Sequence, residues 1–147
     1  MDFLYVSAPV LGYLGAGSIK FFLNSFKTGK WAFNDVGMGS MPSTHNTITS
    51  TTFFVLGFSE GFNSPICGVA LALLLIVAID SLDLRKKIEG HAKVLFEEFS
   101  ETSTMAASLR LKLSHSLSEV LGGIALGAII GYWMVKSSPF IDKLLSV

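Results

Sequence analysis

Several ionisable residues lie at or near the ends of apolar runs, where charged side chains are costly and usually functional: Lys20, His45, Arg85, His115 and Glu119. His115 and Glu119 are four residues apart, so on a helix they are neighbours on one face. A carboxylate that accepts a hydrogen bond from one imidazole nitrogen fixes the tautomer and makes the other nitrogen a better base or nucleophile. The spacing therefore predicts an activated histidine.

Basic side chains supply a second part of this chemistry. Lys20 and Arg85, with Lys27 and Arg110 as further contributors, provide positive charge for an anion that has several oxygens. Phosphoryl transfer requires such a clamp. These residues predict a site for a phosphate group.

The start of a helix near residue 42 offers a third part. Residues 42–45, with the sequence Pro-Ser-Thr-His, open this helix, and the free N–H groups and dipole of a helix start favour a phosphate. His45 at this position could donate a proton to a leaving oxygen. We expect Asp80 to form an ion pair with Arg85 or Lys20 rather than to act as a catalyst.

The composition indicates which elements hold these residues. Of the 147 residues, 50% are hydrophobic and only 15% are charged, and the mean hydropathy is +0.57. The apolar residues are clustered in runs, as in an integral membrane protein. Eleven basic and eleven acidic residues give no bulk attraction for nucleic acid. A single cysteine, Cys67, excludes a disulfide framework and a cysteine-based metal site within one chain.

The runs predict an all-α integral membrane protein with one membrane domain, residues 1–147, and about four transmembrane helices. The expected helices cover residues 3–26, 42–58, 65–84 and 117–135. The second is rich in serine and threonine, so its polar face should point toward the other helices.

A charged segment, residues 85–114, separates the third and fourth expected helices. Apolar residues among its charges favour a helix outside the membrane or along its surface, and a linker is the alternative. If all four helices cross, most lysines and arginines share one side with the charged site residues. The positive-inside rule then places the site on the cytoplasmic side and both termini on the opposite side.

Glycines in the last helix form a stripe, because Gly123, Gly127 and Gly131 are spaced by four residues. Such a stripe lets another helix approach closely, either within the monomer or across a homo-oligomer. The sequence leaves open whether the approaching helix belongs to the same chain or to a second copy.

Three stretches resemble motifs of the type 2 phosphatidic acid phosphatases, membrane lipid phosphate phosphatases related to vanadium haloperoxidases, and in particular their divergent, short branch. Residues 39–45, Gly-Ser-Met-Pro-Ser-Thr-His, are similar to the family's Pro-Ser-x-His loop. Residues 80–86, Asp-Ser-Leu-Asp-Leu-Arg-Lys, look like that branch's Asp-to-Arg segment at the end of a membrane helix. Residues 115–123, His-Ser-Leu-Ser-Glu-Val-Leu-Gly-Gly, are similar to the family's His-x-x-x-Asp before a glycine-rich helix.

This resemblance implies a phosphatase for a lipid or polyprenyl phosphate or diphosphate. It implies that His115 is the nucleophile that forms a phosphohistidine, that Glu119 orients it, and that His45 protonates the leaving alcohol. Family members of this type generally need no metal, so no cofactor is expected. The phosphate-binding residues that it implies are Lys20, Ser43 and Arg85.

The sequence departs from the family pattern at several positions. Glu119 replaces the usual aspartate, and Lys27 stands seven residues after Lys20 where the family has an arginine followed by proline. Arg110 stands five residues before His115, whereas the family spacing is six.

Alternatives remain for the nucleophile and for the function. Arg85 stands six residues before His91, but Leu95 occupies the position where His91 would need a carboxylate, so we favour His115. A protein that binds or transports a phosphorylated lipid could use the same cationic residues without a covalent step. A small scaffold subunit is a third alternative, with the glycine stripe as its interface.

Overall fold

The computed structural model describes residues 3–29 and 41–145, without the side chains of residues 27, 28 and 140–145. The described residues form helices and connecting segments with no strand, so the predicted all-α fold is confirmed. The elements in chain order are α1 (Leu4–Thr28), α2 (Thr44–Glu60), α3 (Pro65–Ile79), the π-helical turn η2 (Asp80–Leu84), α4 (Arg85–Phe99), α5 (Thr104–Ala107) and α6 (Leu117–Leu145).

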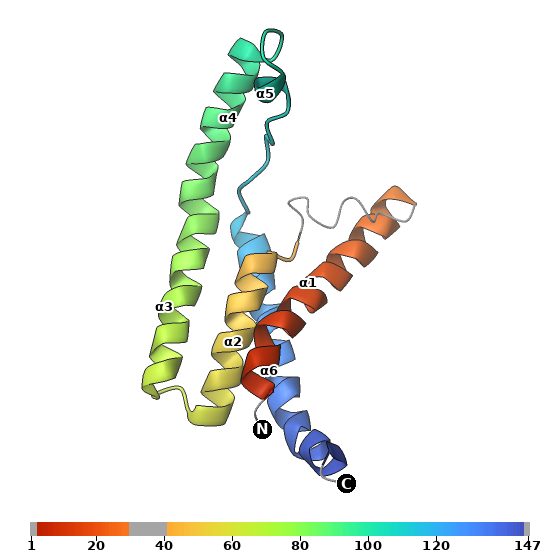
Figure 1. Cartoon of the computed structure of the whole chain (residues 1–147), viewed down its shortest axis with the longest axis vertical. Coiled ribbons are helices and arrows are strands. Elements are labelled where there is room, and N and C mark those ends of the chain that lie inside the picture. The colour runs from red at the N-terminus through yellow and green to blue at the C-terminus, as the bar shows by residue number, and fades with distance from the viewer. Residues whose placement is uncertain (1–2, 30–40, 146–147) are drawn as a thin grey trace.

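Helix α2 is the central element and packs against α1, α3 and α6 (Figure 1). Its polar side chains are buried among these neighbours, including Asn46, Thr47, Ser50 and Thr51. The hydroxyls are satisfied mainly by the helix itself, since Thr51 Oγ1 donates to the carbonyl oxygen of Thr47 at 2.8 Å. The serines and threonines therefore face the inside of the bundle without leaving unpaired donors.

The glycine stripe of α6 is the surface on which α2 packs. A Cβ atom at Gly123 would lie 2.6 Å from the carbonyl oxygen of Ser43, and one at Gly127 would lie 1.9 Å from Ser50 Oγ. Gly131 is equally buried against Phe54 and Val55 of α2. The stripe is thus occupied within one chain, and a second copy could use it only if α2 moved away.

Helices α3, η2 and α4 follow one another without a break from Pro65 to Phe99 (Figure 1). The buried residues of α3 form a narrow stripe of Cys67, Ala70 and Leu74. Only 22% of its most apolar window is buried, so most of its apolar side chains face outward. In water this surface would be unfavourable, whereas hydrocarbon solvates it without cost.

Three helices of the described residues are long and apolar enough to cross a membrane: Leu4–Phe26, Pro65–Phe99 and Leu117–Pro139. They support a multi-pass membrane protein. The fourth expected crossing, in α2, is not among them, because α2 has only 17 residues and many are serine or threonine. A count of four crossings therefore stays a prediction.

The charged segment is partly helical. Helix α4 covers its first half, and the short α5 and an irregular stretch before Leu117 complete it. Helix α4 extends beyond the start of α2, away from the end of the bundle where α1 begins and α6 ends (Figure 1). The irregular stretch runs back along α4 and delivers the chain to His115.

Candidate active site

His115 lies two residues before Leu117, the first residue of α6, and is held by the first turn of that helix. His115 Nδ1 and Glu119 Oε2 are 2.9 Å apart, as the spacing of four residues predicts. Glu119 Oε2 also accepts a hydrogen bond from the Ser116 N–H at 3.0 Å, and Ser116 Oγ accepts one from the Glu119 N–H at 3.3 Å. This reciprocal pair is a capping box, which requires a glutamate or glutamine side chain to reach back to the helix start.

The capping box gives a physical reason for Glu119 in place of aspartate. The longer side chain both closes the first turn of α6 and contacts the imidazole ring. Because Glu119 engages Nδ1, Nε2 is the nitrogen of His115 that remains for a ligand.

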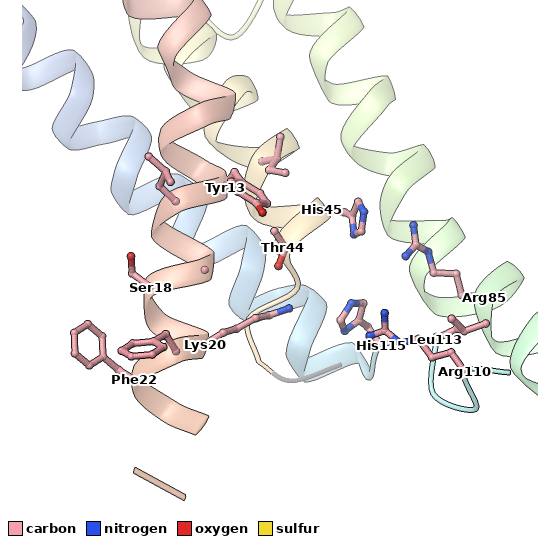
Figure 2. Close-up of a pocket in the computed structure, with 14 residues that line it drawn as sticks. Tyr13, Ser18, Lys20, Phe22, Thr44, His45, Arg85, Arg110, Leu113 and His115 are labelled. Atoms are coloured by element: carbon pink, nitrogen blue, oxygen red, sulfur yellow. The ribbon is translucent and has the colours of Figure 1, made fainter. Parts of the chain in front are cut away.

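A cavity of about 770 Å³ lies in front of His115 and gathers residues from four parts of the chain (Figure 2). Its cationic and imidazole side chains are Lys20 of α1, His45 of α2, Arg85 of α4, and Arg110 and His115 of the connection before α6. The sequence predicted all of these residues, and the tertiary structure brings them to one place. The remainder of the wall is mainly apolar and includes Tyr13, Leu14, Phe21, Phe22, Ile48 and Leu113.

The basic side chains reach the cavity in different ways. Lys20 has only 3% of its surface exposed, and Figure 2 shows its ammonium group pointing toward His115. Arg85 Nε donates to Asp80 Oδ2 at 2.6 Å, so an ion pair orients its guanidinium group at the cavity. The side chain of Lys27 lies outside the described part of the structure.

Ser43 does not line this cavity. It is fully buried, and its hydroxyl oxygen accepts a hydrogen bond from Asn46 Nδ2 at 2.9 Å. Its backbone N–H donates to the carbonyl oxygen of Glu119 at 2.9 Å. Ser43 therefore ties the start of α2 to the start of α6, while its neighbours Thr44 and His45 face the cavity.

Asn46 and Ser81 form a second tie that the sequence did not predict. Asn46 Nδ2 also donates to Ser81 Oγ at 3.1 Å, and both side chains are fully buried. Ser81 lies in η2, where the N–H of Arg85 bonds to the carbonyl oxygen of Asp80, five residues earlier. The carbonyl oxygen of Ser81 accepts the backbone N–H of His115 at 3.2 Å. The π-helical turn thus sets the position of both His115 and Arg85, and such turns are frequent at functional sites.

Glu89 of α4 holds the segment that leads into His115. Its Oε2 accepts hydrogen bonds from the N–H groups of Leu113 and Ser114, both at 3.2 Å, and from Ser114 Oγ at 2.7 Å. Its Oε1 pairs with Lys93 Nζ at 2.8 Å. In the sequence Glu89 is one of several charged residues of the segment 85–114, and no local pattern indicates a contact with residues 24 and 25 positions later.

His91 lies on the exposed surface of α4 and does not line the cavity. Among the described residues, no group of three histidine, cysteine, aspartate or glutamate side chains could hold a metal ion. The chemistry available in the cavity is that of an oriented imidazole, a second imidazole and cationic side chains, all suited to an anionic phosphate group.

Comparison with known proteins gives one family. No curated protein and no solved structure matches the sequence. The model of the Divergent PAP2 family matches residues 3–130. This range covers most of the chain and includes every residue that lines the cavity. The chain therefore belongs to the Divergent PAP2 family.

Proposed function

We propose that this protein is a membrane phosphatase that hydrolyses a lipid or polyprenyl phosphate or diphosphate through a phosphohistidine at His115. The observation that carries the proposal is the contact of 2.9 Å between His115 Nδ1 and Glu119 Oε2, beside a cavity with four other basic side chains. Family membership supports the same class of reaction.

In the first step, the Nδ1–H of His115 donates to Glu119, and the Nε2 lone pair attacks the phosphorus atom. The phosphorus–oxygen bond to the lipid alcohol breaks while the new nitrogen–phosphorus bond forms. His45, protonated at the outset, gives its proton to the leaving alkoxide, so the alcohol departs neutral. Glu119 stabilises the positive charge that His115 acquires.

In the second step, a water molecule attacks the phosphorus atom of the phosphohistidine. His45, now neutral, accepts a proton from this water, and the nitrogen–phosphorus bond breaks to release inorganic phosphate. Both partners return to their starting protonation states. Lys20, Arg85 and Arg110 would contact the equatorial oxygens, where most of the transition-state charge resides.

The apolar part of the cavity supports an amphiphilic substrate. The aromatic and aliphatic side chains of α1 and α2 lie beside the cationic group, so a phosphate and the start of a hydrocarbon chain would fit together. No metal ion is needed in this scheme, because the cationic side chains provide the positive charge.

The membrane arrangement that we propose has α1, α3 and α6 across the bilayer, with α2 as a fourth crossing enclosed by them. The continuous helix of 35 residues is about 52 Å long at 1.5 Å per residue, whereas the hydrocarbon core is about 30 Å thick. Helix α4 would therefore extend outside the membrane. The positive-inside rule assigns the site, which lies at the α4 end, to the cytoplasm.

The test of the function is release of inorganic phosphate from a lipid phosphate in detergent micelles. We expect His115→Ala to reduce the rate by at least about 10³-fold, because the covalent step is lost. His91→Ala is the matched control, since it removes an imidazole outside the cavity, and it should retain the wild-type rate. Equal rates in wild type and His115→Ala would contradict the proposal.

A non-catalytic binder or transporter of a phosphorylated lipid is the competing function. The two are distinguished by mixing the protein with a lipid phosphate that carries a radiolabel in its phosphate group, and then denaturing the protein rapidly without acid. An acid-labile label on wild type that is absent from His115→Ala supports the phosphatase. Stoichiometric ligand binding with no label and no phosphate release would support the binder.

A further inference from the structure

A second hollow lies beside the candidate active site, between α1 and α6. It has a volume of about 460 Å³, and its walls include Leu11, Leu14, Gly15 and Ser18 of α1 and Ile129 and Trp133 of α6. The lining is mostly apolar. Ser137 at its far end uses its hydroxyl to donate to the carbonyl oxygen of Trp133 at 2.7 Å, so the hydroxyl hydrogen is already engaged. We call this hollow the α1–α6 groove.

The α1–α6 groove borders the cavity of the candidate active site. Leu14 and Ser18 line both. Along α1, residues Leu11, Gly15, Ser18 and Phe22 are spaced by four, three and four positions, so they form one stripe on the helix surface. Phe22 lines the cavity, whereas Leu11 and Gly15 line the groove. The stripe therefore leads from one hollow to the other.

The direction of this stripe is along the bundle. From Phe22 to Leu11 the rise of α1 is about 16 Å, at 1.5 Å per residue over eleven residues. Helix α6 runs in the opposite direction, so Ile129 is nearer the candidate active site and Ser137 is farther from it. The groove thus extends away from the phosphate-binding side chains and roughly along the axes of the apolar helices.

We propose that the α1–α6 groove holds the hydrocarbon chain of the substrate while its phosphate lies against Lys20 and His115. The inference rests on the proposed function, and it adds the place that the hydrocarbon chain would take, between α1 and α6. Removal of a hydrocarbon chain from water into an apolar groove is favourable. In a bilayer that gain is already available, so the groove contributes mainly by aligning the chain and its phosphate.

The test compares two substrates of different chain length, hexadecyl phosphate and butyl phosphate, in the same detergent micelles. Two variants fill the groove from opposite walls: Ile129→Trp and Leu11→Trp. Both positions are partly exposed, at 56% and 41%, so the larger ring can be accommodated without unfolding the bundle. We expect each variant to lower the ratio of kcat/KM for hexadecyl phosphate to that for butyl phosphate by about tenfold, because the long chain no longer aligns its phosphate.

Val10→Trp is the matched control. Val10 lies on the exposed surface of α1, at 54%, and lines neither hollow. It should keep the wild-type ratio. Because all variants are compared in the same micelles, any effect of micelle partitioning on the long-chain substrate cancels. The retained butyl phosphate rate shows in each variant that the catalytic residues are intact.

The outcomes separate this inference from the proposed function. If wild type releases no more phosphate than His115→Ala from either substrate, the proposed function fails. If wild type is active but both groove variants keep the wild-type ratio, the chain does not use the groove and the inference is overturned. A loss of both rates together in both groove variants would also overturn it, because the groove would then affect the site rather than the chain.

Discussion

Substitution of Gly127 by alanine tests most directly whether the close packing of α2 on α6 positions His45 and His115. A Cβ atom at this position would lie 1.9 Å from Ser50 Oγ and 2.7 Å from the backbone nitrogen of Thr51. The Ser50 hydroxyl can rotate away, but the backbone cannot. Ordinary contact begins at 3.4 Å, so the helices must separate locally by about 0.7 Å, the difference between 3.4 and 2.7 Å.

This separation has a cost that can be set against a control. Overpacking of a close interface costs about 1–3 kcal/mol, and the bond from Ser50 Oγ to the carbonyl oxygen of Gly123, at 3.3 Å, would be lost as well. Gly68 of α3 has no heavy atom within 4 Å of its Cβ position, so Gly68→Ala should gain up to about 1 kcal/mol of helix propensity. Both substitutions add the same helix propensity, so the two alanine variants should differ in unfolding free energy by the overpacking cost and the lost hydrogen bond, together about 2–4 kcal/mol.

The assay is unfolding in detergent micelles by titration with sodium dodecyl sulfate, followed by far-ultraviolet circular dichroism. Gly127→Ala should unfold at a lower fraction of dodecyl sulfate than wild type, and Gly68→Ala at an equal or higher one. An unchanged midpoint for Gly127→Ala would refute the close packing of α2 on α6. Because α2 carries His45 and α6 follows His115, the same variant should also lower the rate of phosphate release.

Two further predictions concern the residues around the nucleophile. Glu119→Ala should lower kcat for phosphate release by about 100-fold, because His115 loses its contact at Nδ1. This magnitude is at the lower end of what a positioned acid–base partner contributes. An unchanged kcat would contradict the role of Glu119. Glu89→Ala should lower kcat by about tenfold or more, because Ser114 loses its side-chain and backbone hydrogen bonds to the Glu89 carboxylate and small misplacements of a reacting group are costly. Glu97→Ala, at an exposed position on the same helix, is the control and should have no effect. Equal rates in the two variants would show that Glu89 does not position the segment before His115.

Much of the fold and part of the site follow from local patterns. The apolar runs indicate the long helices, because hydrocarbon favours long uncharged helices whatever their tertiary arrangement. The pair of His115 and Glu119 follows from helix periodicity, which places residues four apart on one face. The close approach of another helix to Gly127 also follows from its stripe, since only glycine leaves room for a neighbouring backbone.

Local patterns do not decide which elements meet. The stripe was compatible with a partner in the same chain or in a second copy, and only the packing of α2 identifies the partner. Likewise, the family resemblance implied that Ser43 binds phosphate, but the rotation of α2 against α6 buries Ser43 away from the cavity, where its N–H donates to the carbonyl oxygen of Glu119. Rotation about a helix axis depends on the sum of many side-chain contacts.

The sequence by itself determined that this is a membrane protein of apolar helices, and it identified the residue types and the order of Lys20, His45, Arg85 and His115 along the chain. Only the tertiary structure decided that these four surround one cavity, that Glu89 holds the segment before His115, and that the α1–α6 groove leads away from the site. The physical reason is the separation along the sequence over which each effect acts, since helix periodicity relates residues only a few positions apart. The contact between Glu89 and Ser114 spans 25 residues and depends on the path of an irregular connection, which no periodic pattern specifies.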